Sequence, residues 1–505
     1  MHHDDTPYDI AVIGAGINGA GIARDAAGRG LRVLLCERSD LAAHTSSASS
    51  KLIHGGLRYL EYYEFALVRK ALAEREVVLA SAPHLSWPLR FVMPHAAGLR
   101  PAWLIRAGLL LYDHLALGTR QTLPRSRVVD LAADAAGEPL ARHLRLGFEY
   151  SDAWADDARL VVSCVLDAHL RGATVLPRTG LMRARREGGG WLLHLLAHDG
   201  ITHTARARVL VNAAGPWAAQ LLHDALGRND APALRLVRGS HLVFPRLFRH
   251  ELAYTLQHED GRVVFALPFE QDFTLVGTTD VEQTGDPGEA RCSDAEASYL
   301  CTALNRYLAT PVHPHDTVHR FAGVRPLLDD GGASAAAVTR DYRLDLDTAG
   351  APLLSVVGGK LTTFRRLAEE AMDCIVAATG HGRAAWTARA VLPGGDMGRH
   401  GFAAFRTELA ARHPWLGERL ASRLARAYGT RVHALLDGAQ RRDDLGADLG
   451  EGLHEAELHY LLREEWAWDA ADVLWRRGKM GLRLNASQRT RVQDWMQANR
   501  ARTGA

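Results

Sequence analysis

At the start of the chain, short apolar runs alternate with turn residues in the order of a strand, a helix and a second strand. The apolar run at 8–13 leads directly into GAGINGAG at 14–21, and a second apolar run at 32–36 ends at Glu37. A buried strand that passes through glycines into a helix is the βαβ pattern of dinucleotide-binding domains. We therefore predict that a Rossmann-type nucleotide-binding domain opens this α/β protein.

Three glycines of this segment have separate predicted roles. Gly14 allows the tight turn, Gly16 lets the backbone approach a pyrophosphate, and Gly19 lets the helix pack flat on the strand. The helix begins near Ile17, so its free N–H groups and positive dipole end face the phosphates. Glu37 lies at the distance expected for hydrogen bonds to an adenosine ribose. A glycine turn without a ligand is the alternative, but the complete set of strand, helix, second strand and acid favours a dinucleotide.

Beyond this unit, helical and strand-like segments follow one another. Good helix formers and Glu/Arg pairs at helical spacing predict helices at 60–82 and 160–170. β-Branched and alternating apolar residues predict strands at 172–177, 191–196 and 205–212, an antiparallel sheet over 234–279, and a strand, a glycine pair and a helix over 351–378. After a glycine-rich break at 392–398 the pattern is helical through 400–500, so we place a domain boundary there.

Length and composition narrow the class of protein. At 505 residues the chain needs two or three domains, and a net charge of +2 gives no sign of nucleic-acid binding. Its five cysteines are scattered without a CxxC pair, which argues against a disulfide framework or a zinc site and favours a reducing, cytoplasmic setting. We expect no signal peptide, because the polar opening runs straight into the first strand. No apolar run reaches the roughly 20 residues that span a bilayer.

Lysine is rare in this chain, which gives each lysine more meaning. Only four of the 60 basic residues are lysines, at 51, 70, 360 and 479. Lys51 and Lys360 lie inside motifs, so an ammonium group is expected to be needed there. Residual codon usage is the alternative explanation.

Two segments are candidates for contact with a membrane surface. As a helix, 103–117 carries Arg106 and Asp113 on one face and a broad apolar surface formed by Trp103, Ile105, Leu109, Leu110, Leu111 and Leu115. The segment 475–484 mixes basic residues with Trp475, Met480 and Leu482. Docking against protein, within the chain or in a dimer, is the alternative for both segments, because lipid faces and protein interfaces have the same pattern.

The loop at 45–61, TSSASSKLIHGGLRYLE, combines hydroxyls, a lysine, a histidine, a glycine pair and an arginine. Hydroxyls and free N–H groups suit a pyrophosphate and the edge of a flavin, and Gly55 and Gly56 let the backbone approach a flat ring. At this loop the sequence resembles the FAD-dependent glycerol-3-phosphate dehydrogenases, both the bacterial aerobic and the mitochondrial type. The resemblance covers essentially the whole chain and recurs in FEYSDAWADDARL (148–160), LVNAAGPWA (210–218), RGSHLVFPR (238–246), GTTDVE (277–282), GVRPLL (323–328), TRDYRLDLD (339–347) and GGKLTTFRRLAE (358–369).

The resemblance implies FAD as the cofactor and a fold with three parts. An FAD-binding part (mainly 8–60, 205–220 and 350–380) interleaves with an antiparallel-sheet substrate part (mainly 61–204 and 221–349) within 1–391, and 392–505 forms a helical C-terminal domain. Ala214 departs from the family pattern, because some relatives carry threonine there. The implied cofactor residues are Gly14, Gly16, Ile17, Asn18, Gly19, Glu37, Arg38, Thr45, Ser46, Ser47, Ser50, Lys51, Leu52, Gly55, Gly56, Ala213, Ala214, Gly215, Gly358, Gly359, Lys360, Leu361 and Thr362.

The substrate implied by the resemblance is sn-glycerol 3-phosphate, whose phosphate needs several cationic donors. Matching the family's substrate positions are Arg58, Tyr59, Arg325, Arg340 and Lys360. Oxidation of the C2 hydroxyl needs a proton acceptor with a pKa near neutrality, for which His241 is the candidate, with Arg325 polarising the developing alkoxide. His54 is the second candidate for this base, and a structural role is the alternative for either histidine.

A further group of histidines, at 313, 315 and 319, resembles a metal site in spacing. The proline at 314 argues against a helix there, and neither a cysteine nor a reliable carboxylate completes the set, so we expect a surface loop and no metal.

These implications combine into one functional hypothesis. The protein oxidises sn-glycerol 3-phosphate to dihydroxyacetone phosphate by hydride transfer to FAD, and passes the electrons to a membrane quinone. It is then expected in the cytoplasm as a homodimer, bound to the lipid bilayer surface on the inner face of the cytoplasmic membrane. An FAD-dependent glycerophosphate oxidase that uses oxygen, a non-catalytic flavoprotein scaffold and an NAD-dependent reductase are the alternatives.

Overall fold

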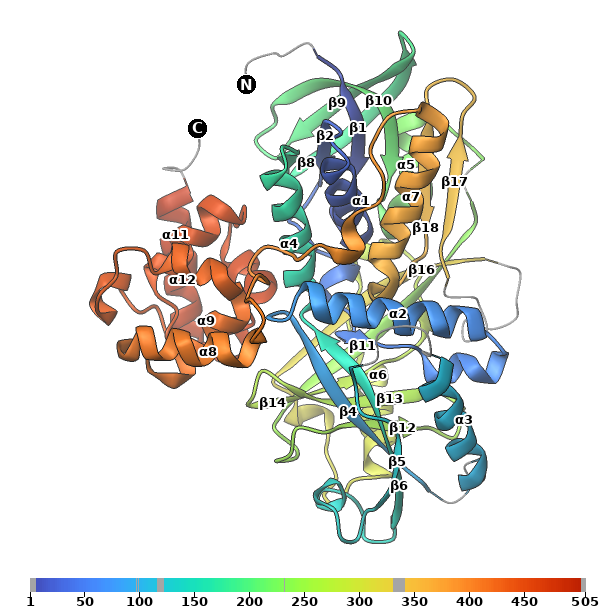
Figure 1. The fold of residues 1–505 in the computed structure, drawn as a ribbon, viewed down its shortest axis with the longest axis vertical. Helices are drawn as coiled ribbons and strands as arrows, with labels where there is room; N and C mark the ends of the chain where they lie inside the picture. The colour runs from blue at the N-terminus through green and yellow to red at the C-terminus, as the bar shows by residue number, and fades with distance from the viewer. Residues whose placement is uncertain are drawn as a thin grey trace.

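The computed structural model describes residues 6–96, 98, 100–115, 122–230, 232–329 and 341–500. Figure 1 shows three parts: a sheet with helices around the N-terminal strand, a second sheet below it, and a group of helices beside both. The chain passes repeatedly between the two sheets, whereas the helical group begins at α8 (Gly401–Arg412) and extends to α12 (Ala486–Arg500).

The strand β1 (Tyr8–Ile13) lies inside the first sheet, parallel to β2 (Val33–Cys36) on one side and to β10 (Thr202–Asn212) on the other. The helix α1 (Ile17–Gly28) connects β1 to β2, so the predicted βαβ unit is confirmed. The strand order is β17, β18, β10, β1, β2, β7, with β8 and β9 attached beside β10. The other strands are β7 (Thr174–Leu176), β8 (Thr179–Glu187), β9 (Gly190–Ala197), β17 (Arg343–Asp347) and β18 (Leu353–Val357).

Helices cover both faces of this sheet. On one face, α1 packs against α4 (Asp157–Leu170) and α7 (Phe364–Thr379). On the other face, α5 (Ala218–Leu226) contributes Leu222 to a buried cluster. The predicted helix at 160–170 and the predicted strand and helix over 351–378 are therefore confirmed. The helix α7 begins at Phe364, after a short turn over Leu361–Thr363, and not directly after the glycine pair at 358–359.

The second sheet is mostly antiparallel and is built around β11 (Leu234–Pro245). The strands β11 to β14 confirm the antiparallel sheet predicted over 234–279. Two strands from distant parts of the chain extend it, since β4 pairs with β12 and β6 pairs with β4. The strands are β3 (Leu52–Ile53), β4 (Ser86–Pro94), β5 (Arg127–Asp130), β6 (Leu146–Ala155), β12 (Ala253–Gln257), β13 (Val263–Phe269), β14 (Phe273–Gly277), β15 (Val281–Glu282) and β16 (His319–Leu328), with α6 (Asp294–Asn305) packed against the sheet.

Two further helices pack against each other beside the second sheet. The segment predicted as one helix at 60–82 is a short turn over Leu57–Tyr62 followed by α2 (Phe65–Ser81), because Tyr63 between them has left-handed backbone with φ +60°. Next to α2 lies α3 (Ala102–Leu115), the helix with the predicted apolar surface.

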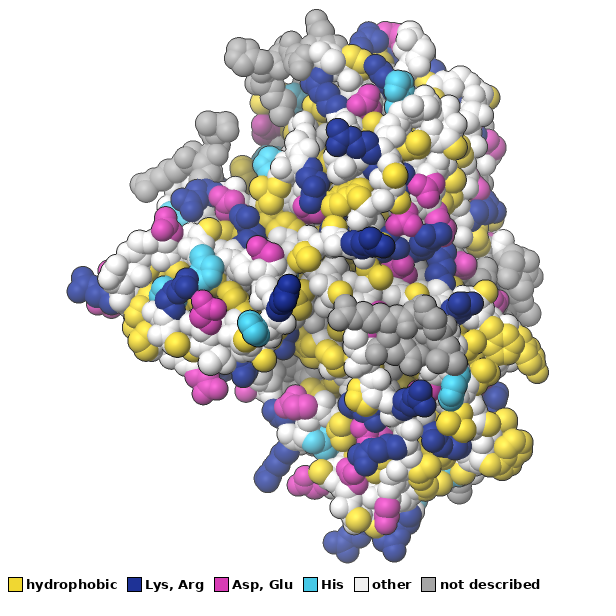
Figure 2. Space-filling view, in the orientation of Figure 1, with side chains coloured by type: hydrophobic (Ala, Val, Ile, Leu, Met, Phe, Trp, Pro, Cys, Tyr) yellow, Lys and Arg dark blue, Asp and Glu magenta, His cyan; other side chains and the backbone are white. Residues whose placement is uncertain are grey.

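The side chains of α3 divide between two environments. Ile105 and Leu109 are buried, whereas Trp103 is 71% exposed and Leu110 and Leu111 are each 41% exposed. Figure 2 shows hydrophobic side chains gathered on this edge of the molecule. The predicted apolar surface is thus partly core and partly an exposed face. Arg106 and Asp113 do not face water freely, since both bond to Ser126.

The C-terminal helices have a hydrophobic core of their own, with Leu424, Leu458 and Leu461 among its buried members. Its remaining helices are α9 (Gly417–Tyr428), α10 (Val432–Leu435) and α11 (Glu455–Glu464). The predicted helical pattern is therefore confirmed.

The predicted lipid contact at 475–484 is wrong, because its basic side chains are paired inside the protein. Arg477 is 1% exposed and bonds to Asp40 of the first sheet's domain, with one N···O distance of 2.8 Å. Arg476 binds the same carboxylate, and Lys479 lies 3.3 Å from Asp156. Other pairs reach the second sheet, where Arg483 binds Asp272. Trp475 stacks on His319 and Met480 is buried, so this segment is an interdomain contact.

We predict that Arg477→Met destabilises the protein strongly. Removing one member of a buried ion pair typically costs up to about 3–5 kcal/mol. Here the buried Asp40 carboxylate loses both of its bonds to Arg477 and keeps Arg476 as a partner. Thermal unfolding followed by circular dichroism should show a clearly lower midpoint. The matched control is Arg419→Met, which removes an exposed partner of Asp272 and should cost less than about 1 kcal/mol. Equal midpoints for the two variants would contradict the docking role of Arg477.

Candidate cofactor and substrate site

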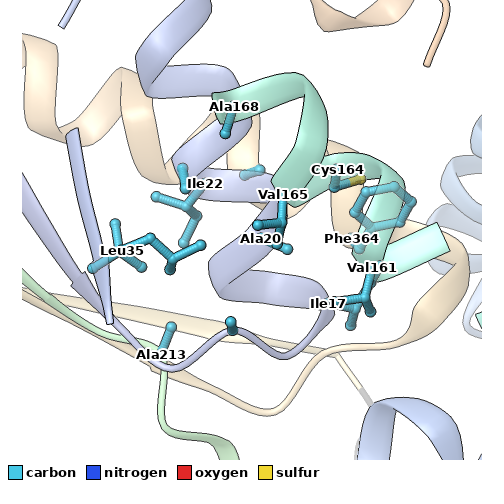
Figure 3. Packing of buried hydrophobic residues seen from close by; sticks show 14 of the residues in the cluster. Ile17, Ala20, Ile22, Leu35, Val161, Cys164, Val165, Ala168, Ala213 and Phe364 are labelled. Carbon is cyan, nitrogen blue, oxygen red and sulfur yellow. The ribbon is translucent and has the colours of Figure 1, made fainter. Parts of the chain in front are cut away.

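The turn after β1 brings two strand ends into close contact. Gly14 has φ +106°, and a Cβ atom there would lie 2.5 Å from the backbone oxygen of Ala213, at the end of β10. A Cβ atom on Gly19 would collide with the backbone of Gly14. Figure 3 shows Ile17 and Ala213 on either side of this turn, with α4 packed over α1. Only glycine therefore allows this approach of β1, α1 and β10.

The start of α1 is held by the loop that follows β2. The backbone N–H of Ile17 donates to Ser46 Oγ at 2.9 Å, and a Cβ atom on Gly16 would lie 3.1 Å from the same oxygen. The N-terminus of α1 thus points into the space between the glycine turn and the loop, where its N–H groups suit a phosphate.

Glu37 occupies the position predicted for a ribose contact, directly after β2. Its carboxylate accepts backbone hydrogen bonds from Ala15 and Ser39, both at 2.8 Å. Burial raises the pKa of Glu37, although these two N–H groups oppose the shift. In the next residue, Arg38, the guanidinium carbon lies 4.1 Å from the centre of the Trp217 ring. This stacked pair forms a flat wall beside the carboxylate.

These elements enclose a cavity of about 360 Å³ at the carboxyl ends of β1 and β10. Its walls include most of the predicted nucleotide residues, namely Gly14, Gly16, Ile17, Asn18, Glu37, Arg38, Thr45, Ser46, Ala213, Ala214, Gly215, Gly358 and Gly359. Sequence analysis missed His44, Thr179, Trp217 and Pro326 on the same walls. Trp217 and Pro326 carried a signal, because they lie in the motifs LVNAAGPWA and GVRPLL.

The geometry of this cavity fits FAD. Asn18 donates to the backbone oxygen of Gly358 at 3.0 Å, while its own Oδ1 is buried and has no partner among the described residues. A Cβ atom on Gly359 would lie 2.9 Å from the Asn18 amide. An unsatisfied buried acceptor beside a glycine pair and a helix N-terminus is the arrangement expected where a polar cofactor completes the site.

Lys51 does not face the nucleotide cavity. Its ammonium is buried, 2.7 Å from Asp157 of α4, and it also donates to the backbone oxygen of Ser47. The Lys51 ammonium is thus used in an ion pair inside the protein, and the contact of Lys51 with the cofactor stays a prediction. The ion pair fixes the loop against α4, and Ser49 binds the same carboxylate.

The predicted base, His241, lies on β11 between two neighbouring strands. Its ring stacks on Phe321 of β16 with 4.9 Å between ring centres. Its Nε2 is 2.9 Å from Ser50 Oγ, in the loop at 45–61, which we call the flavin loop. The imidazole is only 2% exposed, and its Nδ1 has no partner within the described part of the chain. Burial, Lys51 and Arg325 together hold the pKa of His241 well below its usual value of 6.5.

Arg325 extends from β16 on the same face as Phe321. It forms an ion pair with Asp280 and donates to Thr278 Oγ1 at 3.1 Å and to the backbone oxygen of Thr279 at 3.0 Å. Asp280 therefore balances the charge of this cation in its partly buried setting. The neighbouring residue, Pro326, lines the nucleotide cavity.

A second group of predicted substrate residues meets at the glycine pair of the flavin loop. Gly56 has φ +79°, and the ring of Tyr59 lies against it. The Lys360 ammonium lies over that ring, 3.8 Å from its centre. Arg58 is half-buried on the same turn, and Arg340 lies outside the described residues.

The remaining predicted residues lie where the flavin loop meets the segment after the glycine pair at 358–359. The hydroxyl of Thr362 accepts a hydrogen bond from the His54 backbone N–H at 3.1 Å and lies 3.3 Å from the His54 carbonyl. Leu52 is buried in β3, and Leu361 begins the turn before α7. Loop 45–56 and segment 358–362 are therefore joined directly.

The three histidines at 313, 315 and 319 do not converge. His313 and His315 stack on each other, whereas His319 stacks on Trp475 of the C-terminal domain. Across the described ranges, no group of three metal-binding side chains comes together.

Comparison with known proteins identifies the family. A model of FAD dependent oxidoreductases matches residues 9–388, and a model of the C-terminal domain of alpha-glycerophosphate oxidase matches residues 385–498. A glycerol-3-phosphate dehydrogenase of Pseudomonas aeruginosa is 53% identical over 97% of this chain and 95% of its own length. A D-erythritol 1-phosphate dehydrogenase of Brucella abortus is 48% identical over 96% of this chain and 97% of its own. The aerobic glycerol-3-phosphate dehydrogenase of Escherichia coli is 48% identical over 97% of each chain.

A solved structure supports the same assignment. The glycerol-3-phosphate dehydrogenase from Bacillus halodurans, complexed with FAD, superposes with a TM-score of 0.76 and is 26% identical, covering 99% of this chain and 95% of its own. The fold class that we predicted is confirmed, including the FAD-binding domain and the helical C-terminal domain. The chain belongs to the FAD dependent oxidoreductases, and its cofactor is FAD.

Proposed function

We propose that this protein oxidises the C2 hydroxyl of sn-glycerol 3-phosphate to dihydroxyacetone phosphate and passes the electrons to a membrane quinone. The observation that carries the proposal is the near full-length similarity, at 53% and 48% identity, to proteins named glycerol-3-phosphate dehydrogenases. The geometry supports it, because cationic and imidazole side chains flank the FAD cavity. A flavoprotein scaffold has no need of such groups.

The Lys360–Tyr59 pair suits the substrate phosphate. A phosphate ester carries close to two negative charges, and an ammonium held in place by an aromatic ring meets it without losing much side-chain freedom. Arg58 lies on the same turn and adds a second cation. Lys360 follows the glycine pair at 358–359, and Arg58 and Tyr59 follow the pair at 55–56. Because we predict that both pairs contact the cofactor, the phosphate would bind near the flavin.

His241 and Arg325 suit the chemistry at the hydroxyl. The low pKa of His241 keeps its imidazole neutral near pH 7, so it can accept the hydroxyl proton. Arg325 is fixed by Asp280 and by Thr278, so its charge is oriented before the substrate arrives. When bound, FAD accepts the hydride from C2.

D-Erythritol 1-phosphate is the second candidate substrate. A dehydrogenase of that name is 48% identical to this chain, the same identity as the Escherichia coli glycerol-3-phosphate dehydrogenase. Both substrates carry a hydroxyl beside a phosphate-bearing carbon, so the same cationic residues would suit either. Oxygen is the second candidate for the electron acceptor, which would make the protein an oxidase. This candidate rests on the C-terminal family model, which is named after alpha-glycerophosphate oxidase.

The function is tested by anaerobic reduction of the bound flavin, followed by turnover with a chosen acceptor. We expect sn-glycerol 3-phosphate to bleach the flavin with a higher kcat/KM than D-erythritol 1-phosphate. Turnover with a soluble quinone analogue should exceed turnover with oxygen. Faster bleaching by the four-carbon substrate would replace our substrate assignment, and faster turnover with oxygen would make the protein an oxidase.

Lys360→Met is predicted to raise KM for sn-glycerol 3-phosphate much more than it lowers kcat, because it removes a phosphate contact shared by ground state and transition state. A charge-assisted hydrogen bond of about 1.5–3 kcal/mol corresponds to roughly 10- to 150-fold in KM. Steady-state kinetics measure this split. Lys70→Met is the control, because it also removes a lysine from a tyrosine ring, that of Tyr342. A similar KM in both variants would rule out the phosphate role.

His241→Asn is predicted to lower kcat/KM by about 10²–10⁴-fold, the usual contribution of a general base. Because the pKa of His241 is lowered, the wild-type acid limb should fall below pH 6.5, and activity should persist to lower pH than for an ordinary histidine. The pH profile of kcat/KM tests both points. Loss of activity in His54→Asn, with His241→Asn unaffected, would assign the base to His54.

We also propose that α3 contacts the lipid bilayer, which would bring the enzyme to a membrane-confined quinone on the inner face of the cytoplasmic membrane. In the described ranges, no helix is both long and apolar enough to cross a bilayer. Tyr63, in the turn before α2, is also 79% exposed, and the adjoining turn Leu57–Tyr62 contacts α3. Large contiguous apolar patches of this kind mark interaction surfaces. A homodimer completes the proposal, and sedimentation of the purified protein in detergent tests it.

Flotation with anionic liposomes tests the lipid contact. Wild-type protein should float at low salt, and the double variant Leu110→Ser with Leu111→Ser should remain in the soluble fraction. Its matched control carries Leu170→Ser and Met182→Ser, which remove two exposed apolar side chains elsewhere and should leave flotation intact. If wild-type protein does not float, the lipid contact is wrong. If both variants float equally, the contact lies on another surface.

A further inference from the structure

A buried hydrogen-bond chain connects α3 to the flavin loop. The hydroxyl of Tyr112 donates to Asp152 Oδ1 at 2.8 Å and accepts a hydrogen bond from the backbone N–H of Gly55 at 2.9 Å. Tyr112 is 2% exposed and Asp152 is 3% exposed. The chain therefore runs from the flavin loop through a helix to a strand, without access to water.

The carboxylate at the end of this chain is held in place. Arg75 of α2 donates to Asp152 Oδ1 at 2.9 Å and to the backbone oxygen of Ser151 at 2.9 Å. Burial raises the pKa of Asp152, while Arg75 and the Tyr112 hydroxyl favour its charged form. A fixed, paired carboxylate orients the Tyr112 hydroxyl, which in turn presents its oxygen to Gly55. Linked hydrogen bonds of this kind strengthen one another in a buried setting.

The side chains of Tyr112 and Leu72 pack directly against Gly55. A Cβ atom there would lie 2.5 Å from the Tyr112 hydroxyl and 2.6 Å from Leu72. The next residue, Gly56, is covered by the ring of Tyr59, and Lys360 lies over that ring. Gly55 thus directly precedes the residue on which the Tyr59 ring packs. That ring in turn lies under the Lys360 ammonium, which we assign to the substrate phosphate.

We propose that Tyr112 is a positioning residue for the substrate site. It touches neither the nucleotide cavity nor the Lys360 ammonium, and acts by fixing the Gly55 amide, which sets the location of Tyr59 and Lys360. The proposal rests on the proposed function for the identity of the substrate. No sequence pattern singled out Tyr112, because it lies on the inner face of a helix noted only for its apolar residues.

The test is Tyr112→Phe in the FAD-loaded enzyme, which keeps the ring and removes the hydroxyl. Gly55 keeps a longer bond to Asp152, at 3.2 Å, so the fold should persist. Loss of one buried hydrogen bond predicts a KM for sn-glycerol 3-phosphate about three- to tenfold higher, with kcat changed less. The visible absorption band of the bound flavin should also shift, because the loop beside it relaxes.

Tyr150→Phe is the matched control. Tyr150 packs edge-on against Tyr112 in the same buried cluster, and its hydroxyl bonds to Thr255 at 2.7 Å and not to the flavin loop. Both variants remove one hydroxyl from the same cluster, so a merely structural effect should appear equally in their melting temperatures, KM values and flavin spectra. Equal KM values and spectra in the two variants would overturn the proposal.

Amide hydrogen exchange in the wild-type enzyme supplies a measurement that needs no variant. The Gly55 amide should be among the slowest to exchange within 52–62, because its acceptors are buried. Exchange as fast as that of exposed loop amides would overturn the proposal. The flavin spectrum and the exchange rate do not depend on the substrate. A protein that fails to oxidise sn-glycerol 3-phosphate but shows both effects would contradict the proposed function and leave the role of Tyr112 intact.

Discussion

The contact between the Gly14 turn and the end of β10 is the constraint on which the site depends. Because a side chain at Gly14 would meet the Ala213 backbone, only glycine lets β1 and β10 end side by side with α1 beginning directly above them. That convergence points the free N–H groups of α1 at the cavity and brings Asn18 to Gly358, at the end of a third parallel strand. The cofactor cavity is therefore a product of strand order, at the carboxyl edge of the sheet where such folds bind ligands.

The parts of the fold predicted correctly are those encoded over short distances in the chain. The unit β1–α1–β2, the helix α4 and the glycine pair before α7 each follow from local periodicity and turn residues. Joining β4 and β6 to the second sheet was not predictable in this way, because their partners lie far away in the sequence. The interdomain role of 475–484 was hidden for the same reason, since its carboxylate partner Asp40 lies more than 400 residues away.

The candidate site shows the same contrast between features encoded locally in the sequence and contacts between distant residues. Glycines and the acid after β2 were predictable because backbone geometry requires those residue types at fixed spacing. The pairings of charged side chains were not predictable. Lys51 was singled out as a position that needs an ammonium, and only the structure shows that this ammonium pairs with Asp157 of α4. Likewise, the carboxylate partner of Arg325 is Asp280, on the segment after β14. A residue type indicates that a charge is needed, and only the fold shows which group it meets.

The helix α3 shows how one short element can serve two environments. Its outer face carries Trp103, Leu110 and Leu111, and its inner face carries Tyr112, next in sequence to Leu111. A helix moves as a rigid unit over such a short distance, and a hydrogen bond weakens steeply when its distance or angle changes. One buried hydrogen bond, from the Gly55 amide to the Tyr112 hydroxyl, therefore joins α3 to the flavin loop. The same helix thus contributes its outer face to the apolar surface and its inner face to the buried contact with that loop.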